Sequence, residues 1–242
     1  MRQVNALFDD ESVRPSASKQ WQDDLGGGVG TGQINRAGST RQIAVAVLLS
    51  MSGGFLDAFT WLSYHGVFSS SQTGNVVFLG MYAALGKWHE AVRHLPPIAA
   101  FVAGAWIAFR IRARGFSLVV EIVFLAIVML LPSGTPDPLI VFGIAFSSAM
   151  QTASFGFVER WNYSSVTVTG NLLRSLEQLA IKPNPLALHG AKVLLTICVA
   201  FLVGAAAGSF VTQHLGKYGV AMPIALLAFA LWLSPRYRVQ AF

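Results

Sequence analysis

Long apolar segments separated by short polar ones occupy the chain from residue 42 onward. A helix needs about 20 mainly apolar residues to cross a membrane, or slightly fewer where the bilayer thins. Six segments fit this description: 42–64, 95–109, 116–132, 139–158, 191–211 and 220–234. The pattern therefore predicts an all-α polytopic membrane protein with about six transmembrane helices.

Two further apolar segments are too short to cross a membrane. VVFLGMYAALGK follows Asn75, and LLRSLEQLAIK follows Asn171. Each supports about 12 helical residues, or roughly 18 Å, which is about half of a ~30 Å hydrocarbon core. The second segment also carries Arg174 and Glu177, which makes it a poor lipid-facing span. Both segments are therefore predicted to be short re-entrant half-helices.

The same triplet, Thr-Gly-Asn, precedes both short segments, at residues 73–75 and 169–171. Each copy follows a long apolar span and precedes a half-helix, a basic loop and two more spans. An ungapped alignment of the triplets also pairs two sets of serines: Ser52 with Ser148, and Ser69 with Ser165. The chain is thus predicted to contain a transmembrane domain, residues 42–242, built from two repeats at 42–132 and 138–234.

Each predicted repeat contains three full spans, which is an odd number. The second repeat must therefore enter the membrane in the opposite sense to the first. Such inverted repeats are common in transporters and channels. The two half-helices would then enter from opposite membrane faces, with their triplets meeting near the middle.

Basic residues gather in the loops that this six-span arrangement places in the cytoplasm. Eight of them lie on that side: Arg110, Arg112, Arg114, Arg160, Lys182, Lys192, Arg236 and Arg238. Three lie on the other side: Lys87, Arg93 and Lys217. This bias predicts cytoplasmic N- and C-termini. An eight-span alternative, in which both short helices cross fully, stays open, although it moves the cluster at 110–114 outside.

Composition supports a membrane protein and excludes other classes. Charged residues make up 12% of the chain and hydrophobic residues 54%, whereas soluble domains contain about 25% charged residues. The basic loops explain the net charge of +6, so the expected partner is the lipid bilayer and not nucleic acid. Residues 1–41 mix acids, bases and a glycine run, and are predicted to be a disordered cytoplasmic tail.

Asp57 places a carboxyl group inside the first predicted span. An intramembrane carboxylate is costly and indicates a functional residue by default, here one that loads and releases a proton. A structural role, with bonds to Ser52, Thr60 or another helix, is an equal alternative. Gln151 and Thr152 in the fourth span are predicted to bond between helices, or to face the Asp57 side.

Other polar and small residues also have predicted roles. Glu121 in the third span is predicted to pair with Arg110 near the cytoplasmic surface. Arg174 is predicted either to pair with Glu177 or to attract an anionic solute. Three glycines are predicted to let helices approach closely: Gly104, Gly204 and Gly208.

The triplets combine three physical properties. Glycine permits the turn into each half-helix, and the Thr and Asn side chains cap free backbone N–H groups. The backbone N–H groups that stay uncapped, together with the positive end of the helix dipole, are predicted to face a solute. For each triplet alone, a plain helix cap in a tight loop is the alternative. The predicted solute-binding residues are Asp57, Thr73, Gly74, Asn75, Gln151, Thr169, Gly170, Asn171 and Arg174.

Enzyme chemistry has little support in the sequence. It contains no nucleophile elbow, Walker loop, cysteine pair or HExxH motif. The five histidines lie at span borders or in loops and lack the spacing of a metal site. We therefore expect neither an enzyme nor a bound cofactor or metal.

Four stretches carry a resemblance to a known family: GGFLDAFTWL, FSSSQTGNVVFLG, IAFSSAMQTASF and VTVTGNLLR. They resemble the YoaK-like bacterial integral membrane proteins, which are grouped under a domain of unknown function. The resemblance covers roughly residues 42–234. It implies a multi-pass protein of the bacterial inner membrane, and it implies no activity, substrate or catalytic residue.

These observations lead to one functional hypothesis and its alternatives. The leading hypothesis is passage of a small polar solute or ion, as a secondary transporter or channel, with the two triplets lining a central site. The first alternative is a membrane scaffold or sensor with a packed polar core, and an intramembrane enzyme ranks third. The oligomeric state stays open, a homo-oligomer included.

Overall fold

The computed structural model describes residues 36–132, 134–181 and 184–234. Contacts divide the chain into two units, Met1–Gly38 and Ser39–Phe242, and the second unit is described below. Residues 1–35 of the predicted tail lie outside the described residues, whereas 36–41 form the first turns of a long helix. Three of the eight basic residues predicted to lie in cytoplasmic loops are also outside the described residues: Lys182, Arg236 and Arg238.

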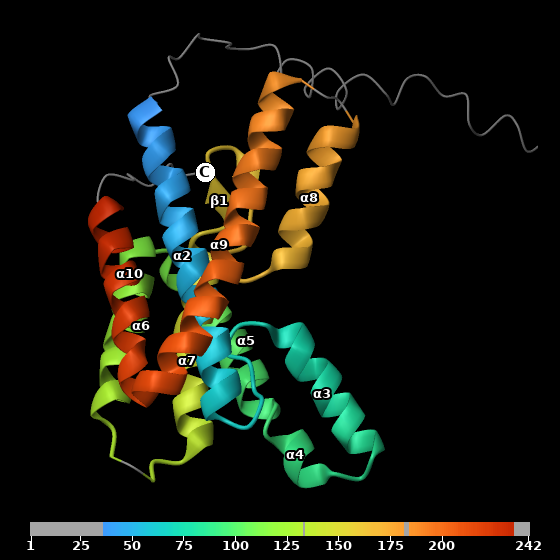
Figure 1. The fold of residues 1–242 in the computed structure, drawn as a ribbon, viewed down its shortest axis with the longest axis vertical. Coiled ribbons are helices and arrows are strands. Elements are labelled where there is room, and N and C mark those ends of the chain that lie inside the picture. The colour runs from blue at the N-terminus through green and yellow to red at the C-terminus, as the bar shows by residue number, and fades with distance from the viewer. Residues whose placement is uncertain (1–35, 133, 182–183, 235–242) are drawn as a thin grey trace, which may run out of the picture. The chain divides into compact units, whose positions relative to one another are not determined.

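The described chain is almost entirely helical, which confirms the all-α prediction (Figure 1). Its helices are α2 (Arg36–Ser63), α3 (Gln72–Ala84), α4 (Trp88–Val92), α5 (Leu95–Ile111), α6 (Arg114–Leu130), α7 (Asp137–Ser154), α8 (Val168–Ile181), α9 (Pro185–Leu215), the 3-10 helix η3 (Gly216–Val220) and α10 (Ala221–Leu233). Between α7 and α8, β1 (Phe157–Val158) and β2 (Trp161–Asn162) form a short antiparallel hairpin, in which Phe157 pairs with Asn162 and Val158 with Trp161.

Three helical segments of the described chain are long and apolar enough to cross a membrane: Gly38–Ser63, Trp88–Ile111 and Pro185–Leu233. Large apolar side chains on these segments are exposed, including Trp106 at 60% and Phe210 at 66%. Such surfaces are costly in water and favourable against lipid. The segments therefore have the character of a membrane protein. Helices α6 and α7 contain only 17 and 18 residues, so the count of six spans stays a prediction.

Helices α2 and α7 run antiparallel, with their ends tied to each other. Directly after α2, His65 Nε2 lies 3.3 Å from Asp137 Oδ2 at the start of α7. After α7, the backbone N–H of Glu159 donates to Gln42 Oε1 near the start of α2, at 2.6 Å. The end of α2 is therefore level with the start of α7, and the hairpin that follows α7 is level with Gln42 of α2.

Two apolar clusters hold the helices together. The larger cluster combines buried side chains from α2, α6, α7 and α10, with Leu49, Leu118, Leu125, Ile144 and Leu227 fully buried. The smaller cluster packs the β1–β2 hairpin against α2 and α9. The predicted span 139–158 therefore ends early, because its last apolar residues belong to the hairpin and the helix stops at Ser154.

Glycines bring two pairs of helices into backbone contact, as predicted from the sequence. A Cβ atom added to Gly104 of α5 would clash with the carbonyl oxygen of Phe146 on α7. A Cβ atom on Gly204 of α9 would likewise clash with the carbonyl oxygen of Met51 on α2, and one on Gly208 would lie 2.6 Å from that of Phe55. Because backbone atoms cannot move aside cheaply, these crossings require glycine.

The α2–α9 crossing gives a direct test. The Gly204→Ala variant should unfold at a lower temperature in detergent, because a methyl group forced into packed backbone costs about 1–3 kcal/mol. The Gly80→Ala variant is the matched control, since a Cβ atom on Gly80 of α3 would have nothing within 4 Å. Equal melting temperatures for the two variants would contradict the close approach of α2 and α9.

Candidate functional site

The segments that lead into α3 and α8 are held by the asparagines of the two triplets. Asn75 Oδ1 accepts the backbone N–H of Phe68 at 3.0 Å, and Asn75 Nδ2 donates to the carbonyl of Phe68 at 2.7 Å. Asn171 makes the same two bonds to Ser164, at 3.0 and 2.7 Å. In both cases the partner lies seven residues earlier. Each asparagine thus satisfies the backbone of an irregular segment, which we call the entry segment (67–71 before α3, 163–167 before α8).

This bonding corrects the predicted role of the asparagines as helix caps. The residue at the N-cap of α3 is Ser71, and its side chain makes no capping bond. Asn75 and Asn171 are buried, whereas Thr73 and Thr169 are exposed. The triplets therefore have a buried, structural end at Asn and an outward-facing hydroxyl at Thr.

The glycines of the triplets are required for space and not for a left-handed backbone. A Cβ atom on Gly74 would lie 2.7 Å from the Phe68 ring. One on Gly170 would lie 3.2 Å from Nη1 of Arg174, whose guanidinium group therefore lies beside the second triplet. Neither glycine is among the residues with a positive φ angle. The predicted turn-forming role is replaced by a packing role.

Asp57 of α2 anchors the first entry segment. Its Oδ1 accepts from Ser69 Oγ at 3.0 Å and from the Ser70 N–H at 2.7 Å, and its Oδ2 accepts from Ser71 Oγ. Thr60, one turn later, accepts the N–H of Ser69 at 3.1 Å. The carboxylate, 4% exposed, is thus saturated by three donors of one short segment. The side-chain partners of Asp57 are therefore residues of this serine run and not Ser52 or Thr60, the structural partners predicted from the sequence.

Gln151 of α7 anchors the second entry segment in a corresponding way. Its Nε2 donates to Ser165 Oγ at 3.0 Å, and Thr152 Oγ1 lies 3.3 Å from the same oxygen. Ser165 is the residue that the repeat alignment pairs with Ser69. Gln151 and Thr152 therefore bind the entry to α8 and make no bond to Asp57.

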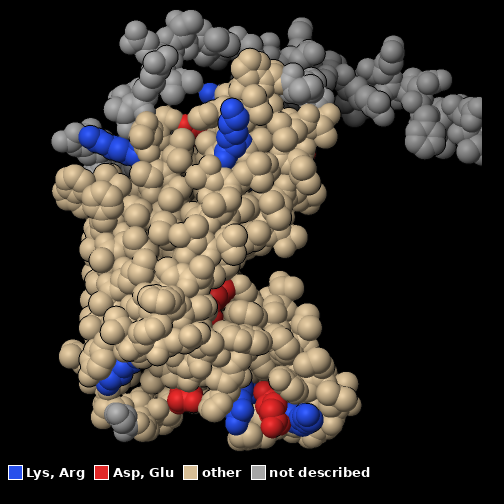
Figure 2. All heavy atoms as spheres, viewed as in Figure 1, with Lys and Arg blue, Asp and Glu red and all other residues tan. Residues whose placement is uncertain are grey.

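Both entry segments contact α2 within one helical turn. A Cβ atom on Gly53 would lie 2.9 Å from Val166 Cγ1 and 3.3 Å from the Ser165 carbonyl oxygen. Gly53 precedes Asp57 by four residues, a rise of about 6 Å along the helix. From these neighbouring points α3 and α8 extend in opposite directions (Figure 1). The surface is hollowed between them, and acidic atoms are visible at the bottom of the hollow (Figure 2).

Comparison with known proteins places the chain in a family. Residues 45–233 match the family described as "Protein of unknown function (DUF1275)". The chain belongs to this family. No curated protein and no solved structure matches it. The match confirms the resemblance stated from the sequence, and it includes both entry segments and both triplets. The DUF1275 description names no activity.

The remaining charged residues of the predicted site are not paired as expected. Within the described part of this DUF1275 chain, the close contacts between acidic and basic side chains are those of His65 with Asp137 and of His189 with Glu159, and Arg174 and Glu177 form no salt bridge. The guanidinium group of Arg174 stays beside Gly170. The other predicted role of Arg174, attraction of an anionic solute, stays a prediction.

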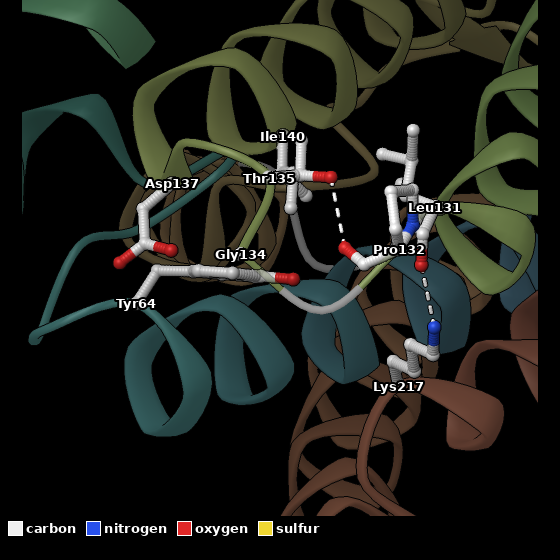
Figure 3. A pocket seen from close by; sticks show the side chains of 9 residues that line it. Tyr64, Leu131, Pro132, Gly134, Thr135, Asp137, Ile140 and Lys217 are labelled. Carbon is white, nitrogen blue, oxygen red and sulfur yellow. Dashed lines mark hydrogen bonds between the residues drawn. The ribbon is translucent and has the colours of Figure 1, made fainter.

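A separate cavity of about 170 Å³ lies where α2 ends and α7 begins (Figure 3). Tyr64, Asp137 and Lys217 line it, and none of the predicted solute-binding residues does. Lys217 Nζ donates to the Leu131 carbonyl at 2.6 Å. Burial, with a smaller contribution from the negative charge of Asp137, raises the pKa of Tyr64 to about 12. Tyr64 therefore stays a neutral phenol at physiological pH, and the cavity is not part of the DUF1275 triplet site.

The asparagine bonds predict a specific stability loss. In the Asn171→Asp variant a carboxylate oxygen replaces Nδ2 and faces the Ser164 carbonyl oxygen. The lost bond and the repulsion should lower the free energy of unfolding by about 1–3 kcal/mol. Thr169→Ala, at the exposed end of the same triplet, should stay within about 0.5 kcal/mol of the wild type. Thermal unfolding in detergent checks both, and an unaffected Asn171→Asp variant would exclude the structural role.

Proposed function

We propose that this DUF1275 chain is a multi-pass protein of the bacterial inner membrane with six spans, two inverted repeats and cytoplasmic termini. Three relations between the halves support the proposal. Helices α2 and α7 are antiparallel, and Asn75 and Asn171 make the same pair of bonds. The close crossings are also exchanged, because α5 of the first half packs on α7 of the second and α9 of the second packs on α2 of the first.

The proposed function is passage of a small polar solute or ion, as a secondary transporter or channel. The observation that carries it is the contact of both entry segments with a single turn of α2, at Gly53 and Asp57. Irregular backbone at membrane depth is tolerated only where protein buries it or where it lines a watery cavity. Half-helices that meet in this way form the solute sites of many transporters.

The residues around the hollow indicate what kind of solute the site would bind. The helix ends at Thr73 and Thr169 carry a partial positive charge and exposed hydroxyl groups. Arg174 adds a full positive charge beside the second helix end. These groups suit a solute that accepts hydrogen bonds, including one with an anionic group. Asp57, with its oxygens occupied by Ser69–Ser71, positions the first entry segment and does not bind the solute.

A non-transporting scaffold or sensor is the second candidate, and enzyme activity is not proposed. The scaffold is favoured by one specific observation. Asp57, Asn75 and Asn171 direct their hydrogen bonds to protein groups of their own half. A transporter would have to open a path past these bonds, whereas a scaffold would keep them.

A flux assay separates the two functions. Purified protein in liposomes should pass one or more members of a library of small polar solutes. The Thr73→Leu/Thr169→Leu variant removes both hydroxyls and fills the hollow, so flux should fall about tenfold or more, equivalent to about 1.4 kcal/mol. Val102→Leu adds a leucine at an exposed position on α5 and should leave flux unchanged. Absence of flux in every case would favour the scaffold.

Membrane topology can be measured independently of the solute. In a Cys198→Ala background, cysteines are placed one at a time at Lys87 and at Arg112. A membrane-impermeant maleimide added to intact cells should label the first position only, and the second after lysis. The reverse pattern is expected if both short helices cross the membrane, and it would establish eight spans.

A further inference from the structure

Glu121 of α6 is a fully buried carboxyl group without a partner. Its exposed fraction is 0%, and neither carboxylate oxygen has a hydrogen-bond partner among the described residues. The predicted surface pair with Arg110 is wrong, because Arg110 is exposed with its guanidinium group 4.8 Å from the Trp106 ring centroid. Glu121 therefore needs another explanation.

Contacts between α6 and α7 fix the level of Glu121 in the helix bundle. Ser117 Oγ lies 2.6 Å from Ser154 Oγ, and a Cβ atom on Gly143 would lie 2.8 Å from the Phe124 ring. The two helices are thus antiparallel neighbours. Glu121 lies between these two contacts, and the corresponding level on α7 is that of Ser148.

Contacts between α2 and α7 add a third side chain at the same level. His65 is level with Asp137, and Gln42 with Glu159. Ser52 lies 13 residues before His65 on α2, and Ser148 lies 11 residues after Asp137 on α7, so the two serines are at levels that differ by about 3 Å along the helices. The Oγ atoms of these two buried serines also lack a partner among the described residues.

The three side chains face the same interior. Leu49 and Leu56 lie on the same face of α2 as Ser52, and both belong to the larger apolar cluster. Ser148 has Ile144 one turn away, and Glu121 has Leu118 and Leu125, all from the same cluster. The face of α2 that carries Gly53 and Asp57 points elsewhere, toward the entry segments. The polar group around Glu121 is therefore distinct from the Asp57 site.

The elements packed on α6 supply Glu121 with no counter-ion among the described residues. Helix α10 has no titratable residue, α7 has only Asp137 at its start, and η3 has Lys217 and Tyr218 at the far end of α6. Lys217 and Arg114 each donate to a backbone carbonyl. They lie near opposite ends of α6, roughly 10 Å or more from Glu121 along the helix. An unpaired buried charge is too costly to persist, so the carboxyl group must be neutral.

We propose that Glu121 binds an exchangeable proton and is a proton site in the bundle interior, at the level of the buried hydroxyl groups of Ser52 and Ser148. In the loaded form Glu121 is a neutral carboxylic acid. On release its O–H bond breaks and the proton passes to water. A role of this site in coupling solute movement to a proton gradient rests on the proposed function. The binding of a proton by Glu121 does not depend on that function.

Infrared spectroscopy of the purified protein tests the site without any solute. At neutral pH the wild type should show the carbonyl-stretch band of a protonated carboxylic acid, and the band should shift in D2O. Glu121→Gln should abolish the band, whereas Asp57→Asn, which removes the other buried carboxyl group, should keep it.

Chemical labelling of the wild type tests the same site without a variant, so its result does not depend on whether Glu121→Gln folds. A hydrophobic carbodiimide adds to a protonated carboxyl group in an apolar site and rearranges to a stable N-acylurea, with no leaving group. Mass spectrometry should find the adduct on the peptide with Glu121 and not on the peptide with Asp57. Loss of labelling at raised pH is expected, whereas loss on adding sodium at constant pH would overturn the proposal in favour of a sodium site.

The outcomes separate this proposal from the transport function. A protonated band that persists in folded Glu121→Gln, or that fails to shift in D2O, overturns the proton site whatever the flux assay gives. The expected infrared result without flux of any solute overturns transport and leaves the proton site intact. With both present, flux through Glu121→Gln should no longer respond to an imposed pH gradient.

Discussion

The structure depends on one constraint, which is that a polypeptide interrupted inside an apolar environment must find hydrogen bonds for its free backbone groups within the protein. The two entry segments meet this constraint with side chains from their own half. Asn75 and Asn171 each bind both the N–H and the carbonyl of a residue seven positions earlier. Helices α2 and α7 then supply Asp57 and Gln151 to hold the serines between. These bonds fix the positions at which α3 and α8 begin.

The same requirement for hydrogen-bond partners distinguishes the two buried carboxyl groups, Asp57 and Glu121. Asp57 receives three donors from consecutive residues, so its charge is compensated and its position fixed. Glu121 is more deeply buried and has no donor among the described residues. One carboxyl group therefore holds the backbone, and the other is left to bind a proton. Position inside a membrane span makes both of them candidates for function, but only the partners distinguish them.

The sequence predicted the helices better than it predicted the contacts. Apolar length located α5, α6 and α10 to within two residues at each end, and the interrupted pattern after each triplet located α3 and α8. Helix α2 begins six residues before its predicted span, inside the predicted tail, and α9 begins six residues before its span and ends four residues after it. Apolarity alone extended the fourth span to residue 158, because the residues after Ser154 are apolar on account of the hairpin and not of a helix.

Side-chain roles were harder to predict, for a physical reason. The sequence identified Asn75, Asn171 and Asp57 as important but assigned them to caps and proton transfer, since the partners of a polar group depend on the path of the chain. The serine run at 69–71 was the available signal for the Asp57 site. For Glu121 the position of Arg110 suggested a pair that the opposite orientation of the two side chains prevents.

The two halves have the same order of helices, but different residues hold their entry segments, and the two segments are therefore held with different strength. The repeat alignment places Ala153 opposite Asp57 and Phe55 opposite Gln151, so each half holds its entry serine by a different residue. Three bonds to a carboxylate, at about 1.5–3 kcal/mol each, hold the first segment more firmly than neutral bonds of about 1 kcal/mol hold the second. Gln151 also retains an unpartnered, buried Oε1 among the described residues. The entry to α8 is therefore the more weakly anchored of the two entry segments.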